Sequence, residues 1–185
     1  MARVIVKVKP KEYLQQGMRY CGGYTIKAIL SAYDFDDDRH PKKYLPLLIK
    51  SLGFILPSNI KKILQKHGLK ISIQRANKVS DKKKLELLKK ELKQNHPVAL
   101  TIGNGYSQTG KYSSLRRHLI AHWISIWGYD DDKKVFYVYD SYTDQKSYDK
   151  VPIGNVERSY NHILRDWKGT IYTRVRSFLY ITVKK

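Results

Sequence analysis

Hydrophobic residues recur along this chain with two different spacings, which separate its expected helices from its expected strands. Apolar residues three and four positions apart predict helices, and short apolar or alternating runs predict strands. Helices are expected over residues 21–33, 57–67, 80–93 and 155–168, with a short or bent helix at 43–52. Strands are expected over residues 1–10, 69–74, 98–102, 122–129, 134–140 and 177–183. Because helices lead and strands follow, this order predicts an α+β fold.

Capping residues and glycines place several ends of these elements. Pro57 stands near the start of the second helix, where Ser58 is a candidate cap. Ser80 is a cap-like residue before the helix at 80–93. Residues 103–118 are polar and contain three glycines, so they predict a long loop.

The composition is that of a globular protein. The chain has 185 residues, of which 42% are hydrophobic and 28% charged, and one domain over residues 1–185 is expected. A single cysteine cannot form an internal disulfide. No run of about 18 apolar residues predicts a transmembrane helix, and the first ten residues are too short and too charged for a signal peptide. The expected location is therefore cytoplasmic.

The formal net charge is +20, from 36 lysines and arginines against 16 acidic residues. A charge of this size attracts polyanions through counterion release, so non-specific polyanion binding is expected even where it serves no function. Two interpretations stay open. The lysine-rich surface is merely solvated, or it serves an anionic partner such as an acidic substrate, a nucleic acid or a membrane surface.

Cys21, the single cysteine, stands at the start of the helix expected over residues 21–33, and Gly22 and Gly23 follow it. The unpaired N–H groups of a helix's first turn favour a thiolate, which is the nucleophilic form of cysteine. The glycines allow the backbone to approach a neighbouring group closely. A lone cysteine is more often an inert buried residue, so its chemistry depends on what lies near it in the fold.

The two strands at 122–129 and 134–140 are joined by a tight-turn composition, Asp130-Asp131-Asp132-Lys133, and predict a hairpin. A turn centred on Asp131 predicts three cross-strand pairs on one face: His122 with Asp140, Ile124 with Val138, and Ile126 with Phe136. Directly opposed side chains have Cβ atoms about 5 Å apart. Asp140 would then accept the Nδ1–H of His122 and leave Nε2 for a thiol. A slip of one residue would break this pairing.

Gln15, six residues before Cys21, is a candidate oxyanion donor together with the Cys21 N–H, and the adjacent Gln16 is the alternative. His118 competes with His122 as the base, but its arginine neighbours indicate a loop. The remaining histidines have no partner pattern: His40, His67, His96 and His162. Neither a zinc-ligand spacing nor a phosphate-binding glycine loop is present, so no metal and no cofactor are expected.

The chain resembles the papain-like cysteine peptidases at Gln15, at the Cys21-Gly22-Gly23 helix start, at His122 with its strand ending Trp127-Gly128-Tyr129, and at Asp140. The most similar branch is that of the double-glycine leader peptidases, which process bacteriocin precursors, and their stand-alone relatives. The resemblance covers residues 10–145. It implies a papain-like fold, in which a helical part carrying the cysteine packs on an antiparallel sheet carrying the histidine and aspartate.

This resemblance also implies a reaction. Cys21 would attack the carbonyl of a peptide substrate, His122 would shuttle the proton, Asp140 would orient His122, and Gln15 would help to hold the oxyanion. The same parts would serve another amidase, a deubiquitinase-like hydrolase or an acyltransferase, because the triad does not choose between water and another acceptor. The alternative function is a catalytically inactive papain-like scaffold acting as a basic binding module for an anionic partner such as nucleic acid.

The chain departs from the family pattern in two places. Ser141 follows the aspartate where family members often have proline, and the loop at 103–118 is long and basic. Both differences bear on the substrate more than on the triad.

Overall fold

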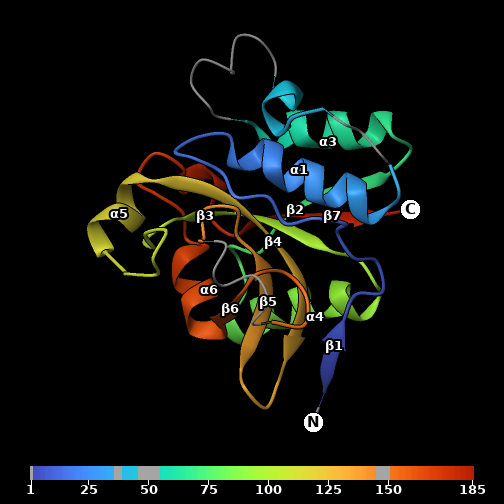
Figure 1. Cartoon of the computed structure of the whole chain (residues 1–185). Helices are drawn as coiled ribbons and strands as arrows, with labels where there is room; N and C mark the ends of the chain where they lie inside the picture. The colour runs from blue at the N-terminus through green and yellow to red at the C-terminus, as the bar shows by residue number, and fades with distance from the viewer. Residues whose placement is uncertain (1, 36–38, 46–54, 145–150) are drawn as a thin grey trace.

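A computed structural model describes residues 2–35, 39–45, 55–144 and 151–185 (Figure 1). In these residues seven strands form one sheet in the order β2–β7–β3–β4–β5–β6, with β1 paired to β4. Every pairing is antiparallel. The strands are β1 (Arg3–Ile5), β2 (Lys70–Arg75), β3 (Val98–Gly103), β4 (Ala121–Asp130), β5 (Val135–Tyr139), β6 (Val156–Ser159) and β7 (Leu179–Lys184).

Helices cover both faces of this sheet, with α1 and α3 on one side and α4 and α6 on the other (Figure 1). They are α1 (Cys21–Ala32), α3 (Pro57–Lys66), α4 (Asp81–Lys93), α5 (Ser114–Leu119) and α6 (Tyr160–Asp166), with short 3₁₀ helices at Pro41–Tyr44 and Arg174–Arg176. α1 packs on β4, and α4 packs against β3 and β4. Every residue of β4 after Ala121 is buried, as expected of a strand that is covered on both faces.

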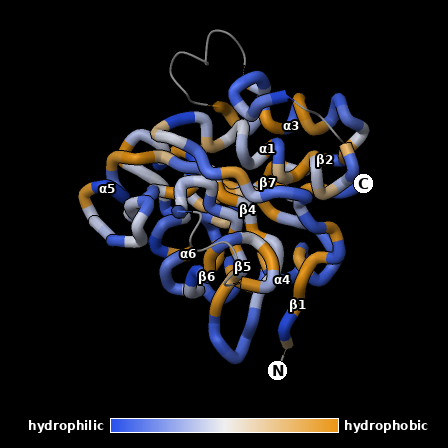
Figure 2. Tube along the Cα trace, viewed as in Figure 1, coloured by the Kyte–Doolittle hydropathy of each residue, from blue (hydrophilic) through white to orange (hydrophobic). Residues whose placement is uncertain are grey.

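The hydrophobic core joins these layers. Ile26 and Ile29 of α1, Trp127 of β4 and Leu88 of α4 are all fully buried, and burying each such side chain stabilises the fold by about 1.5–3 kcal/mol. Figure 2 shows hydrophobic positions along the central strands and hydrophilic positions over much of the outer loops. None of the described helices combines the length and the apolar character needed to cross a bilayer.

Most of the expected elements are confirmed. The helices expected at 21–33, 57–67 and 80–93 are α1, α3 and α4. The Ser80 side chain caps α4 by accepting from the Lys83 N–H at 3.3 Å. The strand expected over 1–10 is shortened to β1, and the other expected strands are present within one or two residues of their predicted ends. The expected α+β arrangement of helices packed on an antiparallel sheet is therefore confirmed.

Three local expectations are wrong. Ser58 does not cap α3, because Leu56 stands at the cap position without a side-chain hydrogen bond and Pro57 opens the helix. The loop at 103–118 contains α5, whose cap is Ser113. The first part of the helix expected at 155–168 is strand β6, which pairs with β5, and α6 begins only at Tyr160. Most of the short helix expected at 43–52 lies outside the described residues.

The register of the β4–β5 hairpin also differs from the expectation. Ile126 pairs with Val138 and Ser125 with Tyr139, and a bulge lies between Ile126 and Gly128. The predicted pairing of His122 with Asp140 is therefore wrong, since continuing this register places Asp140 opposite residue 124. A β-bulge adds an unpaired residue to one strand, and the alternation of apolar residues in these two strands gave no sign of it.

Candidate active site

Cys21 is the first residue of α1, and its free thiol is half-buried. The preceding residue, Tyr20, has a left-handed backbone with φ 77° and offers no side-chain cap. The N–H groups of the first turn have no partner within the helix, so their dipoles favour negative charge on the Cys21 sulfur. The chain thus enters the helix by a sharp turn that places the cysteine at its positive end.

Gly22 and Gly23 allow this end of α1 to pack closely against its neighbours. A Cβ on Gly22 would lie 2.0 Å from Cγ2 of Ile55, and a Cβ on Gly23 would lie 2.3 Å from the carbonyl oxygen of Pro41. Trp123, next to His122 in β4, also borders Gly22. Gly22 therefore lets the start of α1 lie close to β4, and Gly23 lets it lie close to Pro41.

His122 and Asp140 form a buried pair. Nε2 of His122 donates to Oδ1 of Asp140 at 2.8 Å, and the two side chains are each 3% exposed. His122 lies in β4 opposite Ile102 of β3, and Asp140 is the residue that follows β5. The two residues come together although they are not cross-strand partners. Diagonal neighbours lie about 7–8 Å apart, so the far nitrogen of the ring, Nε2, makes the contact.

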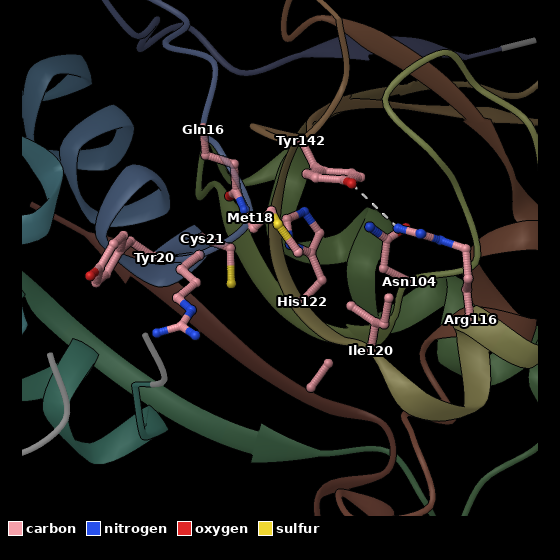
Figure 3. Close-up of a pocket in the computed structure, with 11 residues that line it drawn as sticks. Gln16, Met18, Tyr20, Cys21, Asn104, Arg116, Ile120, His122 and Tyr142 are labelled. Carbon is pink, nitrogen blue, oxygen red and sulfur yellow. Dashed lines mark hydrogen bonds between the residues drawn. The ribbon is translucent and has the colours of Figure 1, made fainter. Parts of the chain in front are cut away.

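The roles of the two ring nitrogens are accordingly reversed from the sequence expectation. Nε2 is used by Asp140, which leaves Nδ1 as the nitrogen for a thiol. Cys21 and His122 lie next to each other in Figure 3, and negative charge on the Cys21 sulfur favours the charged form of the ring. The expectation that Asp140 binds Nδ1 is wrong, because it rested on the unshifted hairpin register.

Electrostatics favour a charged histidine. Burial alone disfavours the imidazolium, but the negative charges of Asp140 and of the Cys21 thiolate, with the hydrogen bond to Asp140, raise the pKa of His122 to about 10. Burial likewise opposes ionisation of Asp140, yet the charge and hydrogen bond of His122 and the charge of Arg158 hold the pKa of Asp140 below its ordinary value. The three side chains therefore stabilise an ion pair at neutral pH.

Asp140 is held by groups that the sequence did not reveal. The side-chain amide of Asn155, which is fully buried, accepts from the Asp140 N–H and donates to the Asp140 carbonyl, both at 2.8 Å. Arg158 donates to Oδ2 of Asp140 at 3.1 Å, and the Tyr142 N–H donates to Oδ1 at 3.0 Å. Asn155 and Arg158 reach the site because β6 pairs with β5. Residues 155–159 were expected to be helical, so no signal pointed to them.

Gln16 rather than Gln15 faces the candidate site. Gln16 is 4% exposed and lines the cavity beside Cys21, and Figure 3 shows its side chain directed toward Cys21 and His122. Ser141 fixes it from behind, since the Ser141 hydroxyl donates to Gln16 Oε1 at 2.5 Å and the Gln16 N–H donates to the Ser141 carbonyl at 2.7 Å. Gln15, also described, is half-buried and lies outside this lining.

A cavity of about 240 Å³ opens over the cysteine and histidine. Its walls come from the segment before α1, from the start of β4, from α5 and from the loop after β5 (Figure 3). The lining residues are Gln16, Met18, Arg19, Tyr20, Cys21, Asn104, Arg116, Ile120, Ala121, His122 and Tyr142. His118, the competing histidine, lies in α5 and borders a different hollow, beside Lys168 and Arg174.

The sequence matches the family model described as the Peptidase C39-like family over residues 8–166. No curated protein matches it. Among solved structures it is similar to a Bacillus anthracis protein described as a C39-like peptidase, with 14% identity, 100% of this chain and 98% of that chain covered, and a TM-score of 0.59.

Two further structures are similar in fold. The peptidase domain of Streptococcus ComA, a bifunctional ABC transporter of a quorum-sensing pathway, is 13% identical, with 93% of this chain and 98% of that chain covered and a TM-score of 0.56. A double-glycine motif protease from an AMS/PCAT transporter, in complex with the leader peptide, is 15% identical, with both chains fully covered at 100% and a TM-score of 0.51. These similarities confirm the expected papain-like fold.

Proposed function

The chain belongs to the Peptidase C39-like family, and we propose that it is a cysteine peptidase in which Cys21, His122 and Asp140 act as the catalytic triad. One observation carries this proposal: the thiol of Cys21 and the ring of His122 share one cavity, and Asp140 lies hydrogen-bonded behind that ring. This arrangement supports the proposal, because thiol catalysis needs a base beside the nucleophile and a carboxylate that orients the base.

In the proposed reaction the Cys21 sulfur attacks the scissile carbonyl carbon as a thiolate. His122, charged through its pairing with Asp140 and the thiolate, gives its proton to the leaving nitrogen, and the C–N bond breaks to give a thioester. His122 then removes a proton from water, whose oxygen attacks the thioester; the C–S bond breaks, the carboxylic acid leaves, and the Cys21 thiolate and the charged His122 are restored. Asp140 supports the imidazolium throughout and keeps Nε2 occupied, so that Nδ1 serves the reaction.

Gln16 is the better candidate for the oxyanion donor. Because Ser141 engages the Oε1 atom of Gln16, the amide NH₂ is the end left to the cavity, where it would join the Cys21 N–H in holding the developing negative oxygen. The proposal therefore moves this role from Gln15 to its neighbour, which is the alternative that the sequence left open.

The proposed substrate is a polypeptide or peptide, in line with the leader-peptide complex of the similar transporter protease. The proposal is tested by incubating the protein with a mixed peptide library and identifying products by mass spectrometry. Wild type should cleave a subset of peptides, and Cys21→Ala should cleave none while keeping its melting temperature, because only one sulfur is lost.

Retained cleavage by the Ala variant would contradict the role of Cys21. The alternative function rests on the net charge of +20. If neither protein cleaves any peptide, and both bind a nucleic acid sequence selectively at high salt, the chain is a binding module instead.

A further inference from the structure

Arg116 stands on the wall of the cavity beside Cys21, and no carboxylate of the described residues pairs with it. It lies in α5, its guanidinium donates to the Tyr142 hydroxyl at 3.4 Å, and its cation is 5.8 Å from the centre of the Tyr142 ring. No ion pair links it to any acidic residue in the described part of the chain, and its buried Nε atom has no hydrogen-bond partner there. An arginine cation that is partly removed from water without a counter-charge is costly, so an anion brought to it would be stabilised.

Asn104 offers a second donor at the same place. It follows β3 and is only 2% exposed, and its Oδ1 atom accepts from the Tyr106 N–H at 3.0 Å. This contact occupies the Oδ1 atom only. No acceptor for the NH₂ group of Asn104 is found among the described residues. Asn104 and Arg116 lie side by side in Figure 3 and both line the cavity.

The charged residues of the described cavity lining are all positive. The described lining includes two arginines, Arg19 and Arg116, and neither aspartate nor glutamate. Asp140, the acid behind His122, already interacts with the His122 and Arg158 cations. A negative group entering the cavity would therefore meet donors and positive charge without repulsion from a lining carboxylate.

We propose that Arg116 and Asn104 form a subsite for a carboxylate of the peptide substrate, on the part of the substrate that leaves after cleavage. This inference rests on the proposed function. Arginine is suited to the site because its planar fork of N–H groups matches a carboxylate, and a buried amide NH₂ supplies a further hydrogen bond.

The assignment to the leaving part follows from the order of groups across the cavity. Figure 3 shows Cys21 on one side of His122 and Arg116 on the other. The proton of His122 goes to the leaving nitrogen, so the residues that follow the scissile bond run past His122 and away from Cys21. Their carboxylate comes either from an acidic side chain or from the free C-terminus of a short leaving peptide, and the two sources share the same chemistry.

The test compares matched peptides built on one cleaved sequence. One pair carries glutamate or glutamine just after the scissile bond, and a second pair ends there in a free acid or an amide. Wild type should prefer the acidic member of at least one pair by about tenfold in kcat/KM, as expected for a charge-assisted contact. The pair that shows the preference identifies the source of the carboxylate.

Variants at two arginines of α5 test whether Arg116 causes the preference for the acidic peptide. Arg116→Gln should reduce the acid-to-neutral ratio of kcat/KM to near unity, and Arg116→Lys should restore part of it. Arg117→Gln is the matched control, because it removes the same charge from the same helix but contacts the Arg165 carbonyl and His118 instead. Arg117→Gln should keep the wild-type ratio and the wild-type rate on the neutral peptide.

Binding to Cys21→Ala protein separates this inference from the proposed function. Titration of the same peptides into that variant measures affinity without turnover, and the added change Arg116→Gln should abolish the tighter binding of the acidic member. Equal cleavage and equal binding of acidic and neutral peptides would overturn the subsite while leaving the peptidase intact. An equal loss of preference in Arg117→Gln would also overturn it, since general attraction to the basic protein would then explain the preference.

Discussion

His122 donates through Nε2 to Oδ1 of Asp140 at 2.8 Å, and each of the two side chains is 3% exposed. A buried histidine and carboxylate at this distance stabilise each other's charges, because both groups are removed from water. His122 lines the cavity that contains Cys21.

Asp140→Asn should keep a hydrogen bond to His122 but remove the charge that supports the imidazolium. In a comparable triad such a change lowers kcat about 10⁴-fold, so a loss of about a thousandfold or more is expected here. Steady-state kinetics on the best library peptide measures it. Asp132→Asn, an exposed change in the β4–β5 turn, is the control. Similar losses at both positions would remove Asp140 from the mechanism.

Arg158→Gln should shift the acidic limb of the pH–rate profile to higher pH. The Arg158 cation, after His122, helps to hold the pKa of Asp140 below its ordinary value. Without it, Asp140 is protonated at a higher pH and support for the His122 cation is lost sooner as pH falls. Arg158→Lys should restore much of the wild-type limb. An unchanged limb in Arg158→Gln would show that this ion pair serves the fold alone.

Gln16→Ala should lower kcat by about 10²- to 10³-fold, the usual effect of removing one oxyanion donor, with a smaller change in KM. Gln15→Ala should have little effect, since Gln15 lies outside the cavity lining. The loss of kcat in Ser141→Ala should lie between the losses in the two glutamine variants, because this change frees the amide of Gln16 without removing it. Rapid kinetics on the same peptide separates kcat from KM, and a larger loss in Gln15→Ala would return the role to that residue.

Stability should fall with rising pH because of His122. Its pKa is raised from an ordinary value of 6.5 to about 10 in the folded protein. The contribution of the charged ring is therefore fully present below pH 6.5 and is lost as pH rises through 10, by about 1.4 kcal/mol for each unit crossed. Denaturant unfolding of wild type and His122→Gln should show a stability difference that shrinks over this range. A difference that does not change with pH would contradict the charged state of the ring.

The sequence predicted which residues form the candidate site better than it predicted the contacts between them. The cysteine at the start of α1 and the order of the histidine and aspartate were visible because each residue lies at the end of a strongly patterned element. The hairpin register was not visible, because the bulge near Trp127 interrupts the pairing without interrupting the apolar pattern. The prediction that Nδ1 of His122 contacts Asp140 depended on that register, so it is wrong for the same reason.

The supporting groups of Asp140 were hidden for a different reason. Asn155 and Arg158 reach it only because residues 156–159 add a strand beside β5, and the polar sequence of that strand has no alternation that would separate it from the helix that follows. The role of Ser141 was hidden too, since a hydroxyl that orients an amide 125 positions away leaves no local pattern. Such contacts are set by tertiary packing rather than by spacing along the chain.

The reactivity of Cys21 tests the central claim, a working thiolate–imidazolium pair, most directly. A free cysteine has a pKa of about 8.5 and is mostly unreactive thiol at pH 6, whereas cysteine nucleophiles that lie beside a histidine cation react as thiolates. Alkylation by iodoacetamide, followed by mass spectrometry from pH 5 to pH 9, reports one site, because the chain has one cysteine. Wild type should react rapidly at pH 6, and His122→Ala, checked for folding by circular dichroism, should react rapidly only at neutral or alkaline pH. A wild-type profile that rises only above pH 8, and that His122→Ala leaves unchanged, would contradict the account.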